Sequence, residues 1–235
     1  MIKNVFEYGD QAVLVDFGDE IKKEINQNVI FVFKKLKQII SENNIVGIEN
    51  ITPSYNKLAI QFDLSKTDIT NIFKLIDQVK NEKVEINFNP NKIEIPINYD
   101  LDFGIDLERL SKITKLETDE IIESHLRTNF YVYMLGFMPG FPYMGDLDPK
   151  LYSKRLETPR VEIAEGSVII VEQFCAIYPY KSPGGWNIIG KTPLKLFNQS
   201  QKNPSLINPG DEIIFKNISK AEFQKIWEKN YENQN

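Results

Sequence analysis

Two stretches of the sequence combine glycine, proline and aromatic residues in a way that regular secondary structure does not favour. The first, GFMPGFPYMGDLDP, covers residues 136–149, and the second, YPYKSPGGWNIIGKTP, covers residues 178–193. Glycine permits positive φ angles, proline fixes φ, and aromatic side chains supply apolar walls. These properties fit a small-molecule site on the loops of a rigid scaffold, and they equally fit aromatic plugs at the ends of a barrel.

The two stretches supply most of the candidate ligand-contacting residues. Adjacent glycines such as Gly184 and Gly185 expose backbone N–H groups, which can bind a carboxylate or an oxyanion. The predicted substrate-binding residues are Phe137, Pro139, Gly140, Phe141, Tyr143, Ser167, Ser182, Gly184, Gly185 and Trp186.

Two residues outside these stretches could supply catalytic groups. His125 is the only histidine, and its ordinary pKa lies near neutrality, so it is a candidate acid–base group at a ligand amide if it lies at the pocket. A histidine near a helix end is also often structural. Arg160, within ETPRVEI, could bind both oxygens of a carboxylate, or it could form a surface ion pair with Glu162 or Glu165. We predict His125 and Arg160 as the catalytic residues.

The common enzyme motifs are absent from the sequence, which contains no Walker loop, GxSxG, HExxH or CxxC. A single histidine and the lack of an Asp/Glu cluster with ligand spacing predict no metal site. The single cysteine, Cys175, excludes an internal disulfide and fits a reducing compartment. It lies in the apolar run VIIVEQFCAIY, which favours a small buried residue over a nucleophile paired with the histidine.

The composition restricts the classes of partner. The chain has 235 residues and a net charge of −5, with no Lys/Arg run, which argues against nucleic acid. The N-terminus has no apolar core of signal-peptide length, and the longest uncharged segment, 128–145, is interrupted by five glycines and prolines. We therefore expect no membrane span and a cytoplasmic protein.

Residues 1–90 show alternating strand and helix patterns. Apolar residues recur at helical spacing in two segments, and Ser65 with Asp68 could form a capping box at the second. The predicted order is a strand at 12–18, a helix at 19–42, strands at 45–52 and 57–64, a helix at 65–81 and a strand at 84–88. This β-α-β-β-α-β order is the split pattern of ferredoxin-like domains.

Residues 91–235 predict a second domain dominated by short strands. After a strand at 93–99, two short helices are expected, and His125 lies on the second. Short apolar runs separated by Gly/Pro turns then favour a barrel or a sandwich. These runs are YVYML, SVIIVEQ, CAIYPY, NIIG, LKLF and DEIIF, followed by a C-terminal helix with Phe223 and Trp227 at i, i+4. The predicted fold class is α+β.

The long motifs resemble one protein family. GFMPGFPYMGDLDPKL, TPR, EGSVII and IYPYKSPGGWNIIGKTPL resemble the subunit 1 family of allophanate hydrolase-type proteins, and GDQAVLVDFG, His125 and NPGDEIIF fall at matching places. That family includes the B subunit of bacterial 5-oxoprolinase and the Kip inhibitor of a sporulation kinase. The resemblance covers nearly the whole chain.

The resemblance implies a ferredoxin-like domain at residues 1–90 and a cyclophilin-like β-barrel at residues 91–235. It also implies a homologous subunit 2 (C-type) partner and an A-type subunit, with which the assembly uses ATP to cleave 5-oxoproline to glutamate. The chain itself has no nucleotide motif. The family leaves two other functions open, namely inhibition of a sensor histidine kinase and a role in a biotin-linked urea or allophanate system.

The sequence departs from the family pattern at three places. The first of two Pro-Arg pairs reads Lys154-Arg155, and the family's Gln-Thr-Gly reads Phe174-Cys175-Ala176. The family's VPAGS reads Ile163-Ala164-Glu165-Gly166-Ser167, so its proline is lost. The change at residues 174–176 removes polar groups, which a site for an amide-bearing acid would be expected to keep. The working hypothesis is a barrel-end pocket with aromatic walls, in which Arg160 and His125 recognise a small carboxylate or amide.

Overall fold

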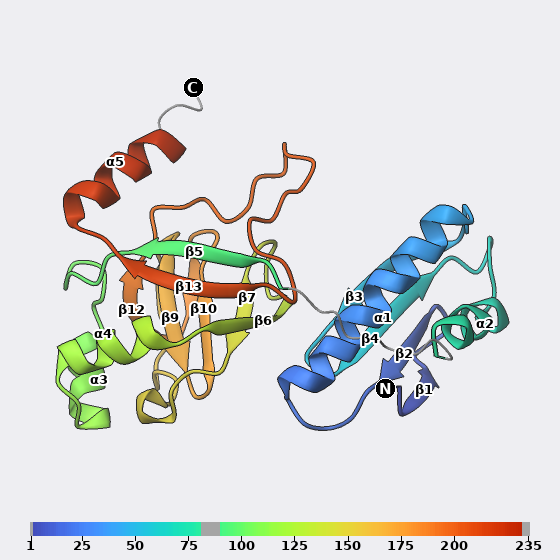
Figure 1. Cartoon of the computed structure of the whole chain (residues 1–235), viewed down its shortest axis with the longest axis horizontal. Helices are drawn as coiled ribbons and strands as arrows, with labels where there is room; N and C mark the ends of the chain where they lie inside the picture. The colour runs from blue at the N-terminus through green and yellow to red at the C-terminus, as the bar shows by residue number, and fades with distance from the viewer. Residues whose placement is uncertain (1, 81–89, 232–235) are drawn as a thin grey trace. The chain divides into compact units, whose positions relative to one another are not determined.

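The computed structural model describes residues 2–80 and 90–231. The chain divides into two compact units, Met1–Asn89 and Pro90–Asn235, which are described separately (Figure 1). The predicted strand at 84–88 lies outside the described residues. Within the described ranges, no helix is both long and apolar enough to cross a membrane, and no group of three or more His, Cys, Asp or Glu residues could hold a metal ion.

The first unit is a four-stranded antiparallel sheet with two helices. The strands lie in the order β1-β2-β4-β3. Their bounds are β1 Asn4–Glu7, β2 Ala12–Asp16, β3 Ile48–Pro53 and β4 Lys57–Phe62, and the helices are α1 Lys23–Glu42 and α2 Ile69–Lys80. Alternate residues of β2 and β4, including Val13, Val15 and Ile60, form the core together with the apolar faces of both helices.

The order from β2 to α2 agrees with the sequence prediction, with two differences. An additional strand, β1, pairs with the outer edge of β2. The predicted capping box also does not form, because Asp68 alone caps α2 by accepting a hydrogen bond from the N–H of Asn71 at 2.9 Å. The hydroxyl of Ser65 is bound to Asp63 instead.

The second unit is built on a seven-stranded sheet that curves into a nearly closed barrel. The strand order is β12-β9-β10-β7-β6-β13-β5, and an isolated bridge between Asn98 and Lys191 joins the two edges. Figure 1 shows β5, β13 and β6 passing across β9 and β10. The bounds are β5 Lys92–Ile97, β6 Phe130–Leu135, β7 Pro142–Gly145, β9 Ser167–Val171, β10 Phe174–Ile177, β12 Asn187–Lys191 and β13 Glu212–Asn217. The α+β class and the predicted barrel are confirmed.

Strand alternation divides the apolar residues of the barrel wall between two cores. On β9, Val168 and Ile170 face the interior core, whereas Ile169 belongs to a second cluster on the outer face. The helices α3 (Leu107–Thr114) and α4 (Thr118–Arg127) supply further interior residues. Because both faces of β9 are covered, all five of its residues are buried.

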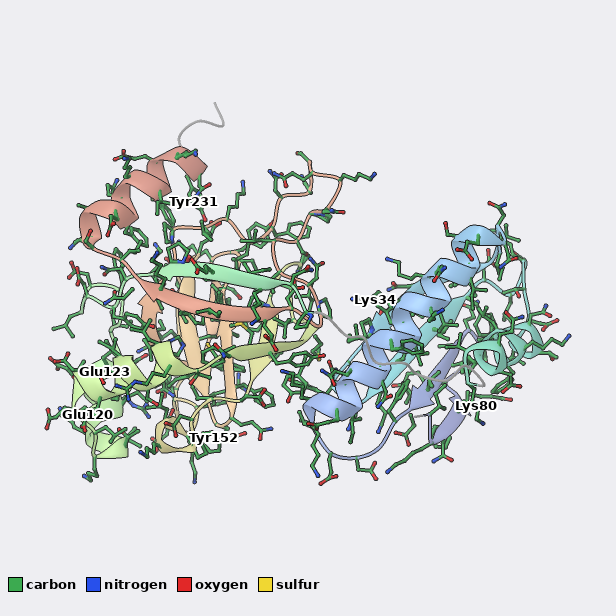
Figure 2. The ribbon with its side chains drawn as sticks, viewed as in Figure 1. Lys34, Lys80, Glu120, Glu123, Tyr152 and Tyr231 are labelled. Atoms are coloured by element: carbon green, nitrogen blue, oxygen red, sulfur yellow. The ribbon has the colours of Figure 1, made fainter. Side chains whose placement is uncertain are left out.

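The C-terminal helix α5 (Lys220–Tyr231) packs as predicted through its aromatic residues. Phe223 lies 4.6 Å from Phe103 between ring centroids, and Trp227 stacks on Tyr231 at 4.0 Å. The ammonium group of Lys191 lies 4.4 Å from the centroid of the Trp227 ring. Figure 2 shows Tyr231 on this helix.

Some short elements differ from the prediction. LKLF (194–197) is not a strand and contributes one isolated bridge, from Phe197 to Ser205. Strand β7 and a separate two-stranded sheet of β8 (Arg160–Ile163) and β11 (Ser182–Gly184) were not predicted. Each of these strands has four residues or fewer, and prolines or glycines occur within β7 and β11, so no period-2 pattern is visible in the sequence.

Candidate functional site

The structure brings the two glycine- and proline-rich loops together in one aromatic cluster. Phe141 lies 5.3 Å from Tyr178 and 6.2 Å from Trp186 between ring centroids, and Tyr143 lies 5.9 Å from Trp186. Phe137 contacts Phe141 at 5.4 Å. Most of these pairs meet edge to face, which is a favoured geometry for aromatic rings.

The aromatic cluster covers the outer face of the barrel wall. It packs on Ile169, Ala176 and Ile188, whose neighbours along the strands point into the interior core. The predicted aromatic walls are therefore present, but they line an outer surface rather than the end of the barrel.

A tight turn sets the shape of the first loop. The N–H of Phe141 donates to the carbonyl of Met138 at 3.1 Å, with Pro139 and Gly140 between them. Gly140 has φ +80°, which identifies a type II turn with proline at its second position and glycine at its third. A Cβ at Gly140 would also lie 2.8 Å from Cβ of Phe197.

Phe137 has a strained backbone and an exposed ring. Its φ is +67°, which is unfavourable for a bulky side chain, and 64% of its surface is exposed. Such strain costs about 1–3 kcal/mol and tends to occur at ligand sites.

Close packing accounts for the glycines of the second loop. A Cβ at Gly184 would lie 1.9 Å from the hydroxyl oxygen of Tyr178, so only glycine allows this tyrosine to extend beneath β11. The carbonyl of Gly185 accepts a hydrogen bond from the N–H of Leu156 at 2.8 Å. The hydroxyl of Ser182 donates a hydrogen bond to the carbonyl of Pro183. Close packing thus accounts for the glycine at position 184, and anion binding by the backbone N–H groups of this loop stays a prediction.

Arg160 is engaged by a carboxylate that sequence spacing did not indicate. Its Nη2 donates to Oδ1 of Asp106 at 2.6 Å, and Oδ2 of Asp106 accepts from the N–H of Ile188 at 2.8 Å. The Asp106 side chain is 4% exposed and that of Arg160 is 27% exposed. Nη1 of Arg160 is buried and has no hydrogen-bond partner among the described residues. Arg160 therefore joins β8 to the start of α3 and to β12, and its predicted binding of a ligand carboxylate stays a prediction.

A second polar network lies beside this ion pair and was not predicted. The fully buried Asn187 donates from Nδ2 to Oγ of Ser153 at 3.0 Å and to the carbonyl of Lys154 at 3.1 Å. Its Oδ1 accepts from Arg109. The network fixes the backbone of residues 153 and 154 against β12. The only sequence signal was a polar residue at the start of an apolar run.

The structure places His125 in the interior core rather than with the loop residues. The side chain is fully buried, and its ring lies 4.9 Å from Phe130 and 4.6 Å from Phe215. Burial lowers the pKa of His125 to about 3, so the imidazole is neutral at physiological pH. It has no path to a ligand, and the condition for a catalytic role is not met.

His125 has two polar partners inside the core. Nδ1 lies 2.7 Å from the hydroxyl of Tyr99, and Nε2 lies 3.5 Å from Sγ of Cys175. Burial raises the pKa of the Cys175 thiol, which is the opposite of what an activated nucleophile requires. The Cys–His pair that sequence spacing did not support is present in space, and it is a neutral hydrogen-bonded pair.

The remaining sequence-predicted positions are structural parts of the barrel wall. Ser167 is 4% exposed, and its carbonyl accepts from the N–H of Tyr178. Of the positions that depart from the family pattern, Cys175 faces the interior core and Ala176 lies under the aromatic cluster. The change at residues 174–176 thus affects the support of the cluster more than its exposed surface.

Residues 3–207 match the family model described as carboxyltransferase domain, subdomain C and D. The chain belongs to this carboxyltransferase family. The matched range includes both loops, the Arg160–Asp106 pair and the Asn187 network, so the predicted family membership is confirmed.

Individual proteins also resemble the chain over most of its length. The B subunit of 5-oxoprolinase from Bacillus subtilis is 32% identical over 228 residues, which cover 92% of this chain and 93% of that protein. The crystal structure of TTHA0988 matches with a TM-score of 0.78 and 25% identity, covering 89% of this chain and 40% of that one. The urea carboxylase of Kluyveromyces lactis matches in fold, with a TM-score of 0.70 and 21% identity, over 96% of this chain and 22% of that one.

Proposed function

We propose that the chain is the B-type component of an ATP-dependent 5-oxoprolinase, which cleaves 5-oxoproline to glutamate. The observation that carries this proposal is the 32% identity to the B. subtilis protein named as the B subunit of 5-oxoprolinase, spread over 93% of that protein. A match along the whole length supports an equivalent subunit rather than a shared module.

The outer aromatic cluster supports a small-molecule role for this component. It offers half-buried Tyr143 and Trp186 and an exposed Phe137 next to buried polar groups that hold the surrounding backbone. Small-ligand sites commonly combine apolar walls with a few fixed polar groups. The strained φ of Phe137 is a further mark of such a site.

The partners in this proposal are a homologous C-type subunit and an A-type subunit, in a cytoplasmic complex. ATP is assigned to the assembly, because the sequence of this chain has no nucleotide-binding motif. We also propose that the first unit is ferredoxin-like. The order β2-α1-β3-β4-α2 and the antiparallel neighbours β2, β4 and β3 support this.

A role in a biotin-linked urea system is the second candidate. It is supported by the fold likeness to the urea carboxylase of K. lactis, of which the chain covers 22%. A third candidate, inhibition of a histidine kinase, would use the exposed loop surface without turnover.

The test is ATP-dependent release of glutamate from 5-oxoproline by the complex of this chain with its A- and C-type partners. We expect release that is lost when this chain is omitted and restored when it is added back. Urea in place of 5-oxoproline tests the second candidate, and autophosphorylation of a sensor kinase tests the third. A well-folded complex without glutamate release would overturn the 5-oxoprolinase proposal.

A further inference from the structure

One arginine beside the aromatic cluster is not used by the fold. Arg155 is exposed, and within the described part of the chain it makes no hydrogen bond or ion pair. Arg160, five residues further along, is bound to Asp106. The two arginines therefore differ in a property that matters for ligand binding, because Nη2 of Arg160 is occupied by Asp106, whereas no side-chain donor of Arg155 is occupied by a described residue.

The backbone on both sides of Arg155 is fixed to the loop that carries Trp186. The carbonyl of Lys154 accepts from Nδ2 of the buried Asn187 at 3.1 Å, and the N–H of Leu156 donates to the carbonyl of Gly185 at 2.8 Å. Arg155 thus lies on a short segment held at each end, so the start of its side chain is placed without a side-chain bond. Preorganisation of this kind reduces the entropy lost on binding.

Two tyrosine hydroxyls lie within the electrostatic reach of Arg155. Burial raises the pKa of Tyr143 and of Tyr178, and the positive charge of Arg155 opposes the rise in both. Tyr143 also contributes to the raised pKa of Tyr178, and both rings contact Phe141. Both phenols stay protonated at neutral pH and can donate hydrogen bonds.

We propose that Arg155, with the hydroxyl of the half-buried Tyr143, forms a subsite for the carboxylate of a small ligand on the outer face of the barrel. The guanidinium binds the carboxylate oxygens, the phenol of Tyr143 donates to the same group, and Trp186 covers the apolar part of the ligand. Tyr178, which is 3% exposed and packs under Gly184, supports this face without contacting the ligand. The choice of 5-oxoproline as the ligand rests on the proposed function.

Arg155 and Arg160 have different roles in this proposal. Arg160, together with Asp106, positions β8 and β12, and Arg155 contacts the ligand. Replacement of Arg160 is therefore expected to destabilise the second unit, whereas replacement of Arg155 is expected to weaken binding in a protein of unchanged stability.

The test compares Arg155→Gln with Arg127→Gln in the full chain and in its complex. Arg127 is also exposed, and it pairs with Glu123 on α4, so the control removes the same charge elsewhere. Binding of 5-oxoproline is measured by calorimetry, and turnover of the complex gives KM and kcat. We expect Arg155→Gln to raise Kd and KM about 10- to 100-fold, with little change in kcat or in the urea midpoint.

Three further measurements distinguish a carboxylate contact from a general surface effect. Pyrrolidin-2-one, which lacks the carboxylate, is expected to bind the wild-type chain at least about 10-fold more weakly than 5-oxoproline and to be insensitive to Arg155→Gln. Arg155→Lys keeps the charge and is expected to recover part of the affinity. Tyr143→Phe is expected to raise KM by a smaller factor than Arg155→Gln.

The outcomes distinguish the subsite from the proposed function. An unchanged Kd and KM in Arg155→Gln, in a complex that releases glutamate, overturns the subsite and leaves the function standing. Arg155-dependent binding of 5-oxoproline in a complex without turnover supports the subsite and overturns the function. A wild-type chain and complex that neither bind nor cleave 5-oxoproline overturn both.

Discussion

At the scale of single residues, His125 shows how burial changes the chemistry of a side chain. Its pKa is lowered from 6.5 to about 3 by burial, whereas the unfolded chain keeps the ordinary value. Above pH 6.5 the imidazole is neutral in both the folded and the unfolded chain, so the stability gained by burying it is fully present. As the pH falls from 6.5 towards 3, only the unfolded state takes up a proton, so stability is lost in this window.

The first prediction concerns this pH window. The free energy of unfolding of the wild-type chain is expected to fall more steeply between pH 7.5 and 5 than that of His125→Gln, which carries no titrating group. The expected difference between the two falls is about 2 kcal/mol, since a group contributes at most about 1.4 kcal/mol per pH unit. Urea denaturation monitored by circular dichroism at several pH values measures the free energy of unfolding of both proteins.

Tyr99→Phe is the matched control for His125, because it removes the partner of Nδ1 and keeps the imidazole buried. This variant is expected to have a lower free energy of unfolding at every pH, with the same dependence on pH as the wild-type chain. Equal pH slopes for wild type and His125→Gln would show that the imidazole takes up its proton as readily in the folded state as in the unfolded state. Glutamate release by a folded His125→Gln complex is also expected, since the ring has no access to a ligand.

The burial of single residues could be predicted from the sequence, whereas their long-range contacts could not. The burial of Cys175 could be predicted from its apolar neighbours, and the structure confirms it. The partner of Arg160 could not be predicted, because Asp106 lies 54 positions earlier and reaches it only after β8 and α3 are in place. The contact between His125 and Cys175 spans 50 positions and depends on the closure of the barrel in the same way.

At the scale of elements, the packing of β11 on the barrel wall depends on the absence of a side chain at Gly184. We predict that Gly184→Ala costs about 2 kcal/mol, because its Cβ would overlap the hydroxyl of Tyr178 at 1.9 Å. In Tyr178→Phe the nearest ring atom is Cζ at 2.9 Å from that Cβ, so part of the clash is removed. The double variant should therefore lose about 1 kcal/mol less than the sum of the single variants.

Gly185→Ala is the matched control for this element. A Cβ at Gly185 meets its nearest neighbours, atoms of Pro159, at 3.6 Å, which is an ordinary contact. Its expected effect on the urea midpoint is small. Equal losses in Gly184→Ala and Gly185→Ala, or additive losses in the double variant, would show that Tyr178 does not set the position of β11.

Elements with a long periodic pattern were the predictable part of the fold. The helix α1 ends at Glu42 as predicted, and the apolar runs around β9, β12 and β13 are strands. Short elements were missed or wrong, because β8 and β11 are specified by each other and by the loops around them. The aromatic loops were predicted as one site, but their place on the outer face follows from strand alternation across the closed sheet.

At the scale of the whole molecule, the described residues form two sets of apolar cores that share no residue. Within residues 2–80 and 90–231, the first core, around Val15, Leu36 and Ile60, draws only on residues before position 80. The interior barrel core and the outer aromatic cluster contain only residues from 93 onwards. Since each unit has its own core, each is expected to fold without the other.

The last prediction follows from this separation. A fragment of residues 90–235 is expected to unfold in one cooperative urea transition and to keep the pH dependence of stability caused by His125. The described partners of His125, namely Phe130, Phe215, Tyr99 and Cys175, all belong to this unit. A fragment of residues 107–235 is the control. It lacks β5, so the parallel partner of β13, the buried Ile95 and Ile97 and the Asn98–Lys191 bridge are all lost, and the barrel cannot close. We expect this shorter fragment to show no cooperative transition. If residues 90–235 also fail to show one, the barrel depends on the first unit for its stability, and the two cores are parts of a single folding unit.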